Sequence, residues 1–469
     1  MKKNQLLDDL HDTIVALCTP RGSGALALLR LSGDDALCVA GTIAKLSSNK
    51  ELQTQPSHTI HHGFVIDPVH QTVVDEVLFF VMHSPKTFTG QDTVEISCHN
   101  NPFIIETVIA LCIKHGARQA NPGEFSKRAY LHGKMDLLQA EGLQDLLGAQ
   151  TQLALKKSFS QLQGSFSSFI KTIEIELFNL LCLVESSFEF LEEEQRDLNF
   201  DSHIKEKIQA ILEQIKTTKN LFNAQQHIKH GIRISLIGSV NVGKSTLFNA
   251  LIKKDRAIVT QHAGTTRDSI EYSLYKDGNF WLVIDTAGLR ETQNSIEQEG
   301  INRSYQEAAA ADIVLLVIDT SEKLCPKQIT VYQKIYNTYA NKIIVVFNKI
   351  DIAQATKNDF GLGLSSHSVR VCAKNNCGIE QLEQAIQTKI QDLFSRLDSP
   401  FLLNQRQHAL LSQMQTKLES IEKSHSDELY YELIAYHLKD ILENVSELTG
   451  KNITEEVLNT VFKTFCIGK

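Results

Sequence analysis

A glycine-rich segment at residues 238–245 has the spacing of a phosphate-binding loop. It reads Gly-Ser-Val-Asn-Val-Gly-Lys-Ser, follows the apolar run 232–237 and precedes a stretch of helical character at 246–253. Glycines let successive backbone N–H groups turn toward one anion, and a helix N-terminus adds partial positive charge. Lys244 is then expected to reach the β- and γ-phosphates and the Ser245 hydroxyl to bind Mg²⁺. The alternative, an ordinary glycine-containing turn, is disfavoured by this strand, loop and helix order.

Two further segments indicate that the nucleotide is GTP. Asp285-Thr-Ala-Gly288 follows an apolar run, where a carboxylate can hold Mg²⁺ through water and a glycine N–H can contact the γ-phosphate. Asn348-Lys-Ile-Asp351 follows a later run, and its last carboxylate can accept hydrogen bonds from N1–H and the 2-amino group of guanine. Adenine lacks both donors and would leave that carboxylate unpaired. An exposed polar loop is the alternative for 348–351. Cys372-Ala-Lys374 lies where a backbone N–H would bind the guanine oxygen, although its first residue is usually serine.

The segment 264–268, Gly-Thr-Thr-Arg-Asp, contains a candidate switch residue. Thr266 can complete the Mg²⁺ shell while the γ-phosphate is present and release it after hydrolysis, with an ordinary turn threonine as the alternative. Leu289 follows Asp-Thr-Ala-Gly, and an apolar side chain cannot orient the attacking water. Glu297 is a candidate for that task, although a solvated helix glutamate is an equal alternative on the residues alone. Arg267 and Arg290 are candidate transition-state cations, but arginines are common near phosphate sites.

Three kinds of sequence pattern predict the elements that hold these motifs. Apolar runs alternating with helical stretches predict a doubly wound parallel sheet, a Ras-like P-loop GTPase domain, at about 230–392. Six of the eight prolines lie in the first 122 residues, which predicts a mixed α/β domain at about 1–125. Apolar residues at helical spacing predict helices at 126–229 and again at 393–469. These helices need each other to bury their apolar faces, so we expect a discontinuous helical bundle into which the GTPase domain is inserted.

Composition limits the function classes. The 469 residues carry a formal charge of −8, with 42% hydrophobic and 22% charged residues, which predicts ordinary globular cores and excludes nucleic-acid binding through bulk positive charge. Nine cysteines without a C-x-x-C pair predict reduced thiols. Asp8 and Asp9 interrupt any signal peptide, and no apolar run is long enough to span a membrane, so the expected location is cytoplasmic.

Together these motifs resemble the MnmE family of bacterial tRNA-modification GTPases, also called TrmE. The likeness runs along essentially the whole chain and includes the segments 12–16, 88–90, 121–129 and 134–141, besides the GTPase motifs. Its most specific part is the terminal Cys466-Ile-Gly-Lys469, a C-x-G-K ending that follows an interrupted helical domain.

The resemblance implies a potassium ion at the GTP site. Asn241 is expected to bind K⁺ with oxygens of Thr260, His262 and Thr265, so that K⁺ replaces an arginine finger, and Glu297 is expected to position the attacking water. In the family, the GTPase domains meet across a homodimer when GTP and K⁺ are bound. Motifs and resemblance together predict that GTP, Mg²⁺ and K⁺ contact residues among Asn241, Val242, Gly243, Lys244, Ser245, Thr246, Thr260, Gln261, His262, Ala263, Gly264, Thr265, Thr266, Asp285, Thr286, Ala287, Gly288, Asn348, Lys349, Asp351, Cys372, Ala373 and Lys374.

The resemblance also implies a folate site and a partner protein. The amino-terminal domain is expected to form the constitutive homodimer and to bind 5-formyl-tetrahydrofolate or a related one-carbon tetrahydrofolate through Arg30, Glu95, Lys134 and Lys469. With an FAD-containing MnmG-type subunit, in a heterotetramer, the family adds an aminomethyl or carboxymethylaminomethyl group to C5 of the wobble uridine of certain tRNAs. Cys466 can act there as a nucleophile, or be merely an exposed cysteine.

Two rival interpretations have less support. A ribosome-assembly GTPase that binds RNA without modifying it shares the central motifs, but many such proteins carry a KH module or a second GTPase domain, and neither pattern is visible in this sequence. A membrane-surface, dynamin-like GTPase calls for a basic amphipathic helix, and the sequence has no strong one. The motifs therefore favour tRNA modification.

Overall fold

The computed structural model describes most of the chain, and its contacts divide it into two compact units. The first unit comprises Met1–Gln144, Gln161–Gln214 and Ala409–Lys469, and the second comprises Asp145–Ser160 and Ile215–His408. The described residues are 11–22, 24–190, 198–220, 222, 229, 231–253, 270–285, 305–322, 324–352, 368–395, 399–423 and 431–468. Within these ranges, no helix combines the length and the apolar character that crossing a membrane requires.

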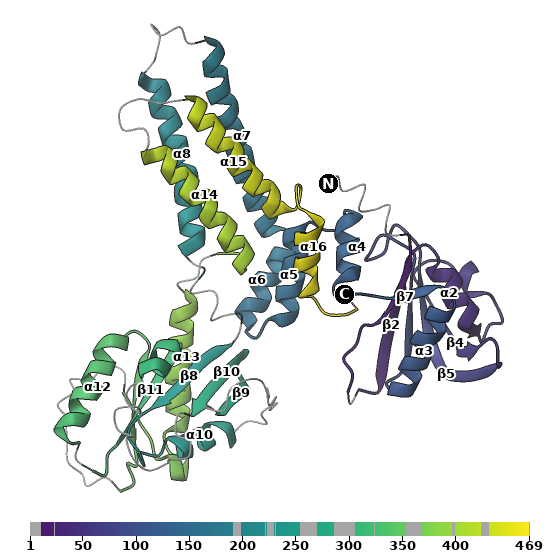
Figure 1. Ribbon diagram of the computed structural model, residues 1–469. Coiled ribbons are helices and arrows are strands. Elements are labelled where there is room, and N and C mark those ends of the chain that lie inside the picture. Colours follow the sequence, from purple (N-terminus) through teal and green to yellow (C-terminus); the bar gives the residue numbers. More distant parts are fainter. Residues whose placement is uncertain are drawn as a thin grey trace. The chain divides into compact units, whose positions relative to one another are not determined.

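A seven-stranded mixed sheet forms the amino-terminal part of the first unit (Figure 1). Its strands, in spatial order, are β3 (Ala44–Leu46), β4 (Thr59–Asp67), β5 (Thr72–Met82), β6 (Thr93–His99), β2 (Leu26–Ser32), β1 (Thr13–Leu17) and β7 (Ala117–Gln119). Only β1 and β7 pair in parallel. The buried side chains of the sheet pack against α2 (Ala36–Ile43) and α3 (Pro102–Lys114), which cover one of its faces. The mixed α/β fold predicted for this region is confirmed.

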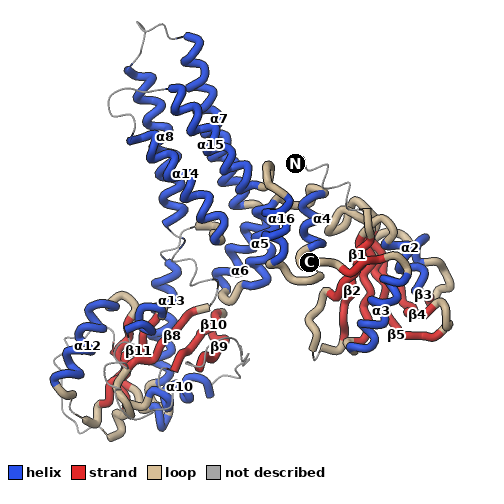
Figure 2. The backbone as a smooth tube through the Cα atoms, viewed as in Figure 1, coloured by secondary structure: helices blue, strands red, loops and turns tan. Residues whose placement is uncertain are grey.

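The rest of the first unit is helical (Figure 2). Its helices are α4 (Glu124–Leu131), α5 (Leu137–Gly148), α7 (Ser165–Phe190), α8 (Leu198–Asn220), α14 (Gln405–Lys423), α15 (Tyr431–Thr449) and α16 (Glu455–Lys463). The ion pair of Lys439 with Glu185 joins α15 to α7, although the whole GTPase region separates them in the sequence. The apolar stripe of α15 is fully buried, as the helical spacing predicts. Helices before and after the insertion therefore do pack together.

The second unit is built on a six-stranded sheet. Its strands, in spatial order, are β13 (Ser368–Arg370), β12 (Ile343–Asn348), β11 (Ile313–Asp319), β8 (Ile232–Ile237), β10 (Asn279–Asp285) and β9 (Ile270–Lys276). All neighbours are parallel except β9 and β10. On one face lie α10 (Lys244–Lys253) and α13 (Ile379–Ser395), and on the other lies α12 (Pro326–Tyr339). Successive residues of β11 point alternately into the apolar core beneath α10 and α13 and into the apolar core beneath α12. Burial on both faces explains why the sequence of β11 is apolar throughout.

The order of this sheet indicates where a ligand would bind. From β8 the chain adds β10 on one side and β11 on the other, so the strand order reverses beside β8. In open α/β sheets, ligands bind at the carboxyl ends of the strands at such a reversal. The loop after β8, residues 238–243, lies at this position.

One short helical segment belongs with this sheet. In α6 (Gln152–Leu162), the Gln152 N–H donates to the Gly278 carbonyl over 2.9 Å, and the Phe280 N–H donates to the Gln150 carbonyl over 3.0 Å. Residues 145–160 therefore cluster with the second unit, whereas the sequence places them in a helical domain of 126–229. The boundaries proposed from the sequence, at about 125, 229 and 392, stay predictions.

Candidate functional site

The loop after β8 has the backbone of a phosphate-binding loop. Asn241 has a φ of +63° and Gly243 a φ of +94°, so the chain turns sharply twice before α10 begins at Lys244. The buried Lys244 ammonium donates hydrogen bonds to the Gly238 carbonyl over 2.8 Å and to the Ser239 carbonyl over 2.7 Å. The lysine thus lies folded over its own loop, where an anion would sit.

Two glycines of the loop are required by close approach to other strands. A Cβ atom on Gly238 would lie 2.4 Å from the carbonyl oxygen of Val317, and one on Gly243 would lie 2.3 Å from Nδ2 of Asn348. Real Cβ atoms do not approach other heavy atoms so closely. Packing against β11 and β12, as well as phosphate binding, therefore explains why glycine stands at these two positions.

Asn348 joins the three nucleotide-binding segments. Its buried side chain donates from Nδ2 to the Val242 carbonyl over 2.8 Å and accepts from the Ala373 N–H over 3.1 Å. The phosphate-binding loop, the 348–351 segment and the 372–374 segment are thereby linked through one amide group. The structure thus brings together segments that lie more than 100 residues apart in the sequence.

The other residues of the 348–351 segment differ in their surroundings. Lys349 forms an ion pair of 2.6 Å with Asp319 at the end of β11. Burial opposes ionisation of Asp319, but hydrogen bonds from Lys349 and Ser321 hold the pKa of that carboxyl below its usual value. Asp351 is exposed beside Cys372, where burial and the Asp351 carboxylate both raise the pKa of the Cys372 thiol. An exposed carboxylate at this place is available to a base.

A second site lies in the first unit, where Arg30 of β2 faces Glu95 of β6. The two side chains form an ion pair of 2.7 Å, and both are largely buried. The Arg30 guanidinium also lies over the rings of Phe88 and Phe125, 5.5 and 5.6 Å from their centroids. Charged and aromatic groups at one place suit a planar ligand that carries carboxylates.

The C-terminal tail reaches this second site. The Gly468 carbonyl accepts from Arg30 Nη1 over 3.5 Å and from the Cys18 thiol over 3.2 Å. The Gly123 N–H donates to the Cys466 carbonyl over 3.3 Å, while the Cys466 side chain is exposed. Two of the predicted folate residues, Arg30 and Glu95, therefore meet, and the tail lies beside them.

Comparison with known proteins identifies the family. The model named MnmE helical domain matches residues 137–466, and the model named GTP-binding protein TrmE N-terminus matches residues 13–134. Three proteins named tRNA modification GTPase MnmE resemble the chain over 98% of its length. The protein from Christiangramia forsetii is 36% identical, and 100% of its own length is covered. The proteins from Enterococcus faecalis and Thermotoga maritima are each 35% identical, with 98% and 100% of their own lengths covered. The chain belongs to the MnmE family.

Part of the chain is also similar to solved structures. The G domain of the Thermotoga maritima FeoB iron transporter is 28% identical and covers 34% of this chain and 99% of its own, with a TM-score of 0.27. At that TM-score the likeness adds nothing to the fold, which stands on the MnmE models and on the sheet itself.

Several residues expected to act in an MnmE-family site lie outside the described residues. These are Glu297, the residues from Thr260 to Thr266, the residues from Thr286 to Gly288, and Lys469. Their roles stay predictions. Asp285 is described as the last residue of β10. Lys134 is described and exposed, and its ammonium contacts the Pro85 carbonyl, in the loop that carries Phe88.

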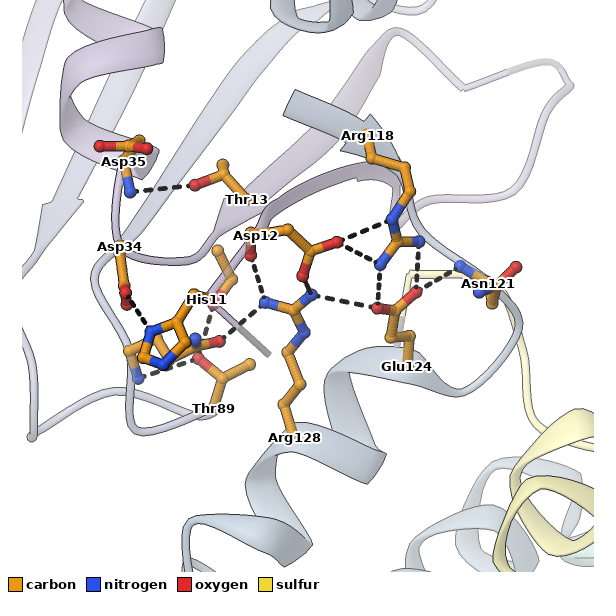
Figure 3. A network of polar contacts seen from close by, with 12 residues as sticks. His11, Asp12, Thr13, Asp34, Asp35, Thr89, Arg118, Asn121, Glu124 and Arg128 are labelled. Atoms are coloured by element: carbon orange, nitrogen blue, oxygen red, sulfur yellow. Dashed lines mark hydrogen bonds and ion pairs between the residues drawn. The ribbon is translucent and has the colours of Figure 1, made fainter. Parts of the chain in front are cut away.

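A polar network fixes α4 of this MnmE-family chain against β1 and β7 (Figure 3). The fully buried Arg128 donates to the Asp12 carboxylate over 2.6 Å and to the Glu124 carboxylate over 3.1 Å. Arg118 bonds the same two acids, over 2.6 and 2.7 Å. Burial opposes ionisation of Glu124, but hydrogen bonds from Arg118 and the Asn121 N–H and the charge of Arg128 lower the pKa of Glu124 to about 2.

One support of the phosphate-binding loop was not predicted from the sequence. The Ser239 N–H and hydroxyl bond the Tyr332 hydroxyl of α12 over 2.9 and 2.6 Å, and Gln328 donates to the same serine over 3.1 Å. No local pattern connects these residues, which lie about 90 positions apart in the chain. Only the packing of α12 against the sheet brings them together.

Proposed function

We propose that this chain is a potassium-stimulated GTPase that, with an FAD-containing MnmG-type partner, adds an aminomethyl or carboxymethylaminomethyl group to C5 of the wobble uridine of certain tRNAs. The coarser part, GTP hydrolysis in tRNA modification, follows from membership of the MnmE family. The observation that carries the nucleotide assignment is the link through Asn348 between the phosphate-binding loop and the two guanine-specific segments.

The residues of the loop suit a magnesium nucleotide. Lys244 donates to two loop carbonyls, and phosphate oxygens would take over these hydrogen bonds when GTP binds. Ser245 is exposed in the first turn of α10, so its hydroxyl is available to Mg²⁺. The helix N-terminus adds favourable charge for the phosphates. Asp351 would accept the two guanine donors and thereby select GTP over ATP.

The potassium site is proposed around Asn241. Its side chain is exposed at the sharp turn of the loop, and an amide oxygen is a suitable ligand for a hard cation. The other expected oxygens, from Thr260, His262 and Thr265, lie outside the described residues. When bound, K⁺ would supply positive charge to the transition state of phosphoryl transfer.

The folate site is proposed around Arg30 and Glu95. Arginine can pair with the glutamyl carboxylates of a tetrahydrofolate, and the Glu95 carboxylate can accept from the amide and amine of its pterin. The rings of Phe88 and Phe125 lie within reach of the same guanidinium. Lys134 contacts the loop that carries Phe88, which supports its place at the rim of the same site.

Replacing Asn241 with glycine tests the potassium site. Glycine tolerates the φ of +63°, so Asn241→Gly removes the amide without straining the turn, as alanine would. We expect GTP turnover in K⁺ to fall about tenfold or more, to the rate in Na⁺, with GDP affinity little changed. Equal wild-type rates in K⁺ and Na⁺ would reject the potassium site.

Cells that lack this chain test the modification itself. Mass spectrometry of wobble uridines should find the C5 group absent from those cells and restored when the chain is returned. Restoration should fail with Lys244→Ala, which removes the phosphate-binding ammonium. If the uridines are unchanged in the deletion cells, the ribosome-assembly interpretation replaces this proposal.

A further inference from the structure

Two cysteines oppose each other beside the guanine-specific segments. Cys372 and Cys377 form an antiparallel bridge, in which the Cys372 N–H donates to the Cys377 carbonyl over 2.9 Å and the Cys377 N–H donates back over 3.1 Å. Such directly opposed residues have Cα atoms about 5.5 Å apart and side chains on the same side. Disulfides span this same Cα separation.

The turn between the two cysteines is held in place. Asn376 has a φ of +55°, and Gly378 has a φ of +78° with room for no Cβ, because one would lie 2.2 Å from the Arg370 carbonyl oxygen. The close approach of Gly378 to Arg370 therefore helps to keep Cys372 and Cys377, which lie between them in the sequence, in register. Both cysteines are free thiols in the structure, Cys372 buried and Cys377 exposed.

The position of the pair connects it to nucleotide binding. Ala373, next to Cys372, donates its N–H to Asn348, the residue that links this segment to the phosphate-binding loop. The thiol of the buried residue Cys372 itself lies beside the Asp351 carboxylate, whose charge helps to raise the pKa of that thiol. A covalent bond at Cys372 would therefore act on both Asp351 and Asn348.

We propose that Cys372 and Cys377 form a disulfide when a peroxide oxidises them, and that this disulfide weakens guanine nucleotide binding. The proposal rests on the proposed GTP site and assigns a regulatory modification to it. Reduction by a dithiol restores binding.

The chemistry balances with a peroxide as the oxidant. The exposed Cys377 thiolate attacks one peroxide oxygen, which forms a sulfenic acid and releases hydroxide. The Cys372 sulfur then attacks the Cys377 sulfur, the S–S bond forms, and the leaving hydroxide takes the Cys372 proton as water. Two thiols lose two electrons in total, and hydrogen peroxide is reduced to two waters.

The effect on binding follows from what the disulfide removes. It takes away the thiol hydrogen beside Asp351 and turns the buried Cys372 sulfur away from Asp351 toward the exposed Cys377. The hydrogen bond from Ala373 to Asn348 is then strained, and with it the link to Val242. We expect oxidation to lower GDP affinity about tenfold or more.

The test compares the reduced and the peroxide-treated full-length chain, with fluorescent GDP as the probe. Trypsin cleaves after Lys374, so the peptides 371–374 and 375–389 remain joined only if the disulfide has formed. We expect these joined peptides, a loss of GDP affinity, and recovery of both with dithiothreitol. Oxidised chain that carries the disulfide and still binds GDP normally would overturn the proposal, as would a failure of the disulfide to form.

Matched variants exclude the other cysteines. Cys377→Ser removes the disulfide partner at an exposed position, and this variant should keep its GDP affinity after peroxide. Cys372→Ser should likewise show no change between its own reduced and treated forms. Cys182→Ser, at another exposed position on α7, should stay as sensitive as the wild type. Equal sensitivity in Cys377→Ser would overturn the proposal, whereas a reduced wild type without GTP preference would instead reject the proposed function.

Discussion

At the scale of single residues, the nucleotide site depends on side chains with one task each. Lys244 donates to two carbonyls of the phosphate-binding loop, Asn348 links three segments, and Asp351 is exposed near the end of one of them. The Asn348 amide nitrogen donates to Val242 and its oxygen accepts from Ala373, and a contact of Asn348 with the nucleotide stays a prediction. We propose that selectivity for the base depends mainly on Asp351.

Exchanging Asp351 for asparagine should change which base the site selects. Asp351→Asn replaces an acceptor by a donor at one carboxylate oxygen, which suits the 2-oxo group of xanthine and not the 2-amino group of guanine. We expect GDP affinity to fall about 100-fold and affinity for xanthosine diphosphate to rise, as measured by competition binding. The control is Asp277→Asn at the exposed turn between β9 and β10, which should bind GDP normally. Unchanged guanine preference in Asp351→Asn would disprove the role of Asp351.

At the scale of elements, α4 is fixed to the amino-terminal sheet by charge. Arg128 is fully buried, and its partners Asp12 and Glu124 come from the start of β1 and from α4 itself. A buried guanidinium is stable only while it is paired, so this network sets where α4 begins. The C-terminal tail also contacts the start of α4, because the Gly123 N–H donates a hydrogen bond to the Cys466 carbonyl.

Removing the buried arginine should loosen α4. Arg128→Met leaves Glu124 with only Arg118 as a charged partner and should lower the free energy of unfolding of this region by about 3 kcal/mol. Hydrogen exchange of residues 117–131 measures the loss. Arg21→Met, which removes an exposed pair with Glu106, should change stability by less than about 1 kcal/mol. Similar effects of the two substitutions would contradict the importance of burial.

The stability of the same element should depend on pH through Glu124. Its pKa is about 2 in the folded chain, against an ordinary value of 4.5, so the folded state favours the carboxylate. This contribution amounts to about 3 kcal/mol above pH 4.5 and is lost as the pH falls from 4.5 toward 2.

The measurement compares the wild type with Glu124→Gln. Protection of α4 amides, corrected for the intrinsic exchange rate, should decrease from about pH 5 to about pH 3 in the wild type. The glutamine variant has no carboxylate there and should show a weaker dependence. Parallel pH profiles in the two proteins would assign the effect to other acids.

At the scale of the molecule, the strands β1 and β2 meet the tail residues 466–468 in the first unit. The tail residue Gly468 lies against the Leu17 carbonyl of β1 and accepts from Arg30 and Cys18. The helices α15 and α16 lead the chain back from the inserted GTPase region to α7 and α4. The proposed folate site therefore combines residues of the amino-terminal sheet with residues of the C-terminal tail.

A methyl group at Gly468 should separate the tail from this site. The residue has a φ of +94°, and a Cβ there would lie 2.5 Å from the Leu17 carbonyl oxygen. We expect Gly468→Ala to lower affinity for 5-formyl-tetrahydrofolate about tenfold, by titration calorimetry, with GDP affinity unchanged. Gly148→Ala, where a Cβ meets nothing, is the control. Normal folate binding by Gly468→Ala would show that the tail is not part of the site.

The sequence by itself determined the GTPase fold and the nucleotide. The strands, the phosphate-binding loop and the guanine-specific segments are each local patterns, because phosphate and base contacts use short loops at strand ends. Tertiary structure alone decided which distant residues meet: Arg128 with Asp12, Ser239 with Tyr332, and Lys439 with Glu185. Hydrophobic periodicity shows that a face is buried but not what covers it, since many partners bury equal apolar area.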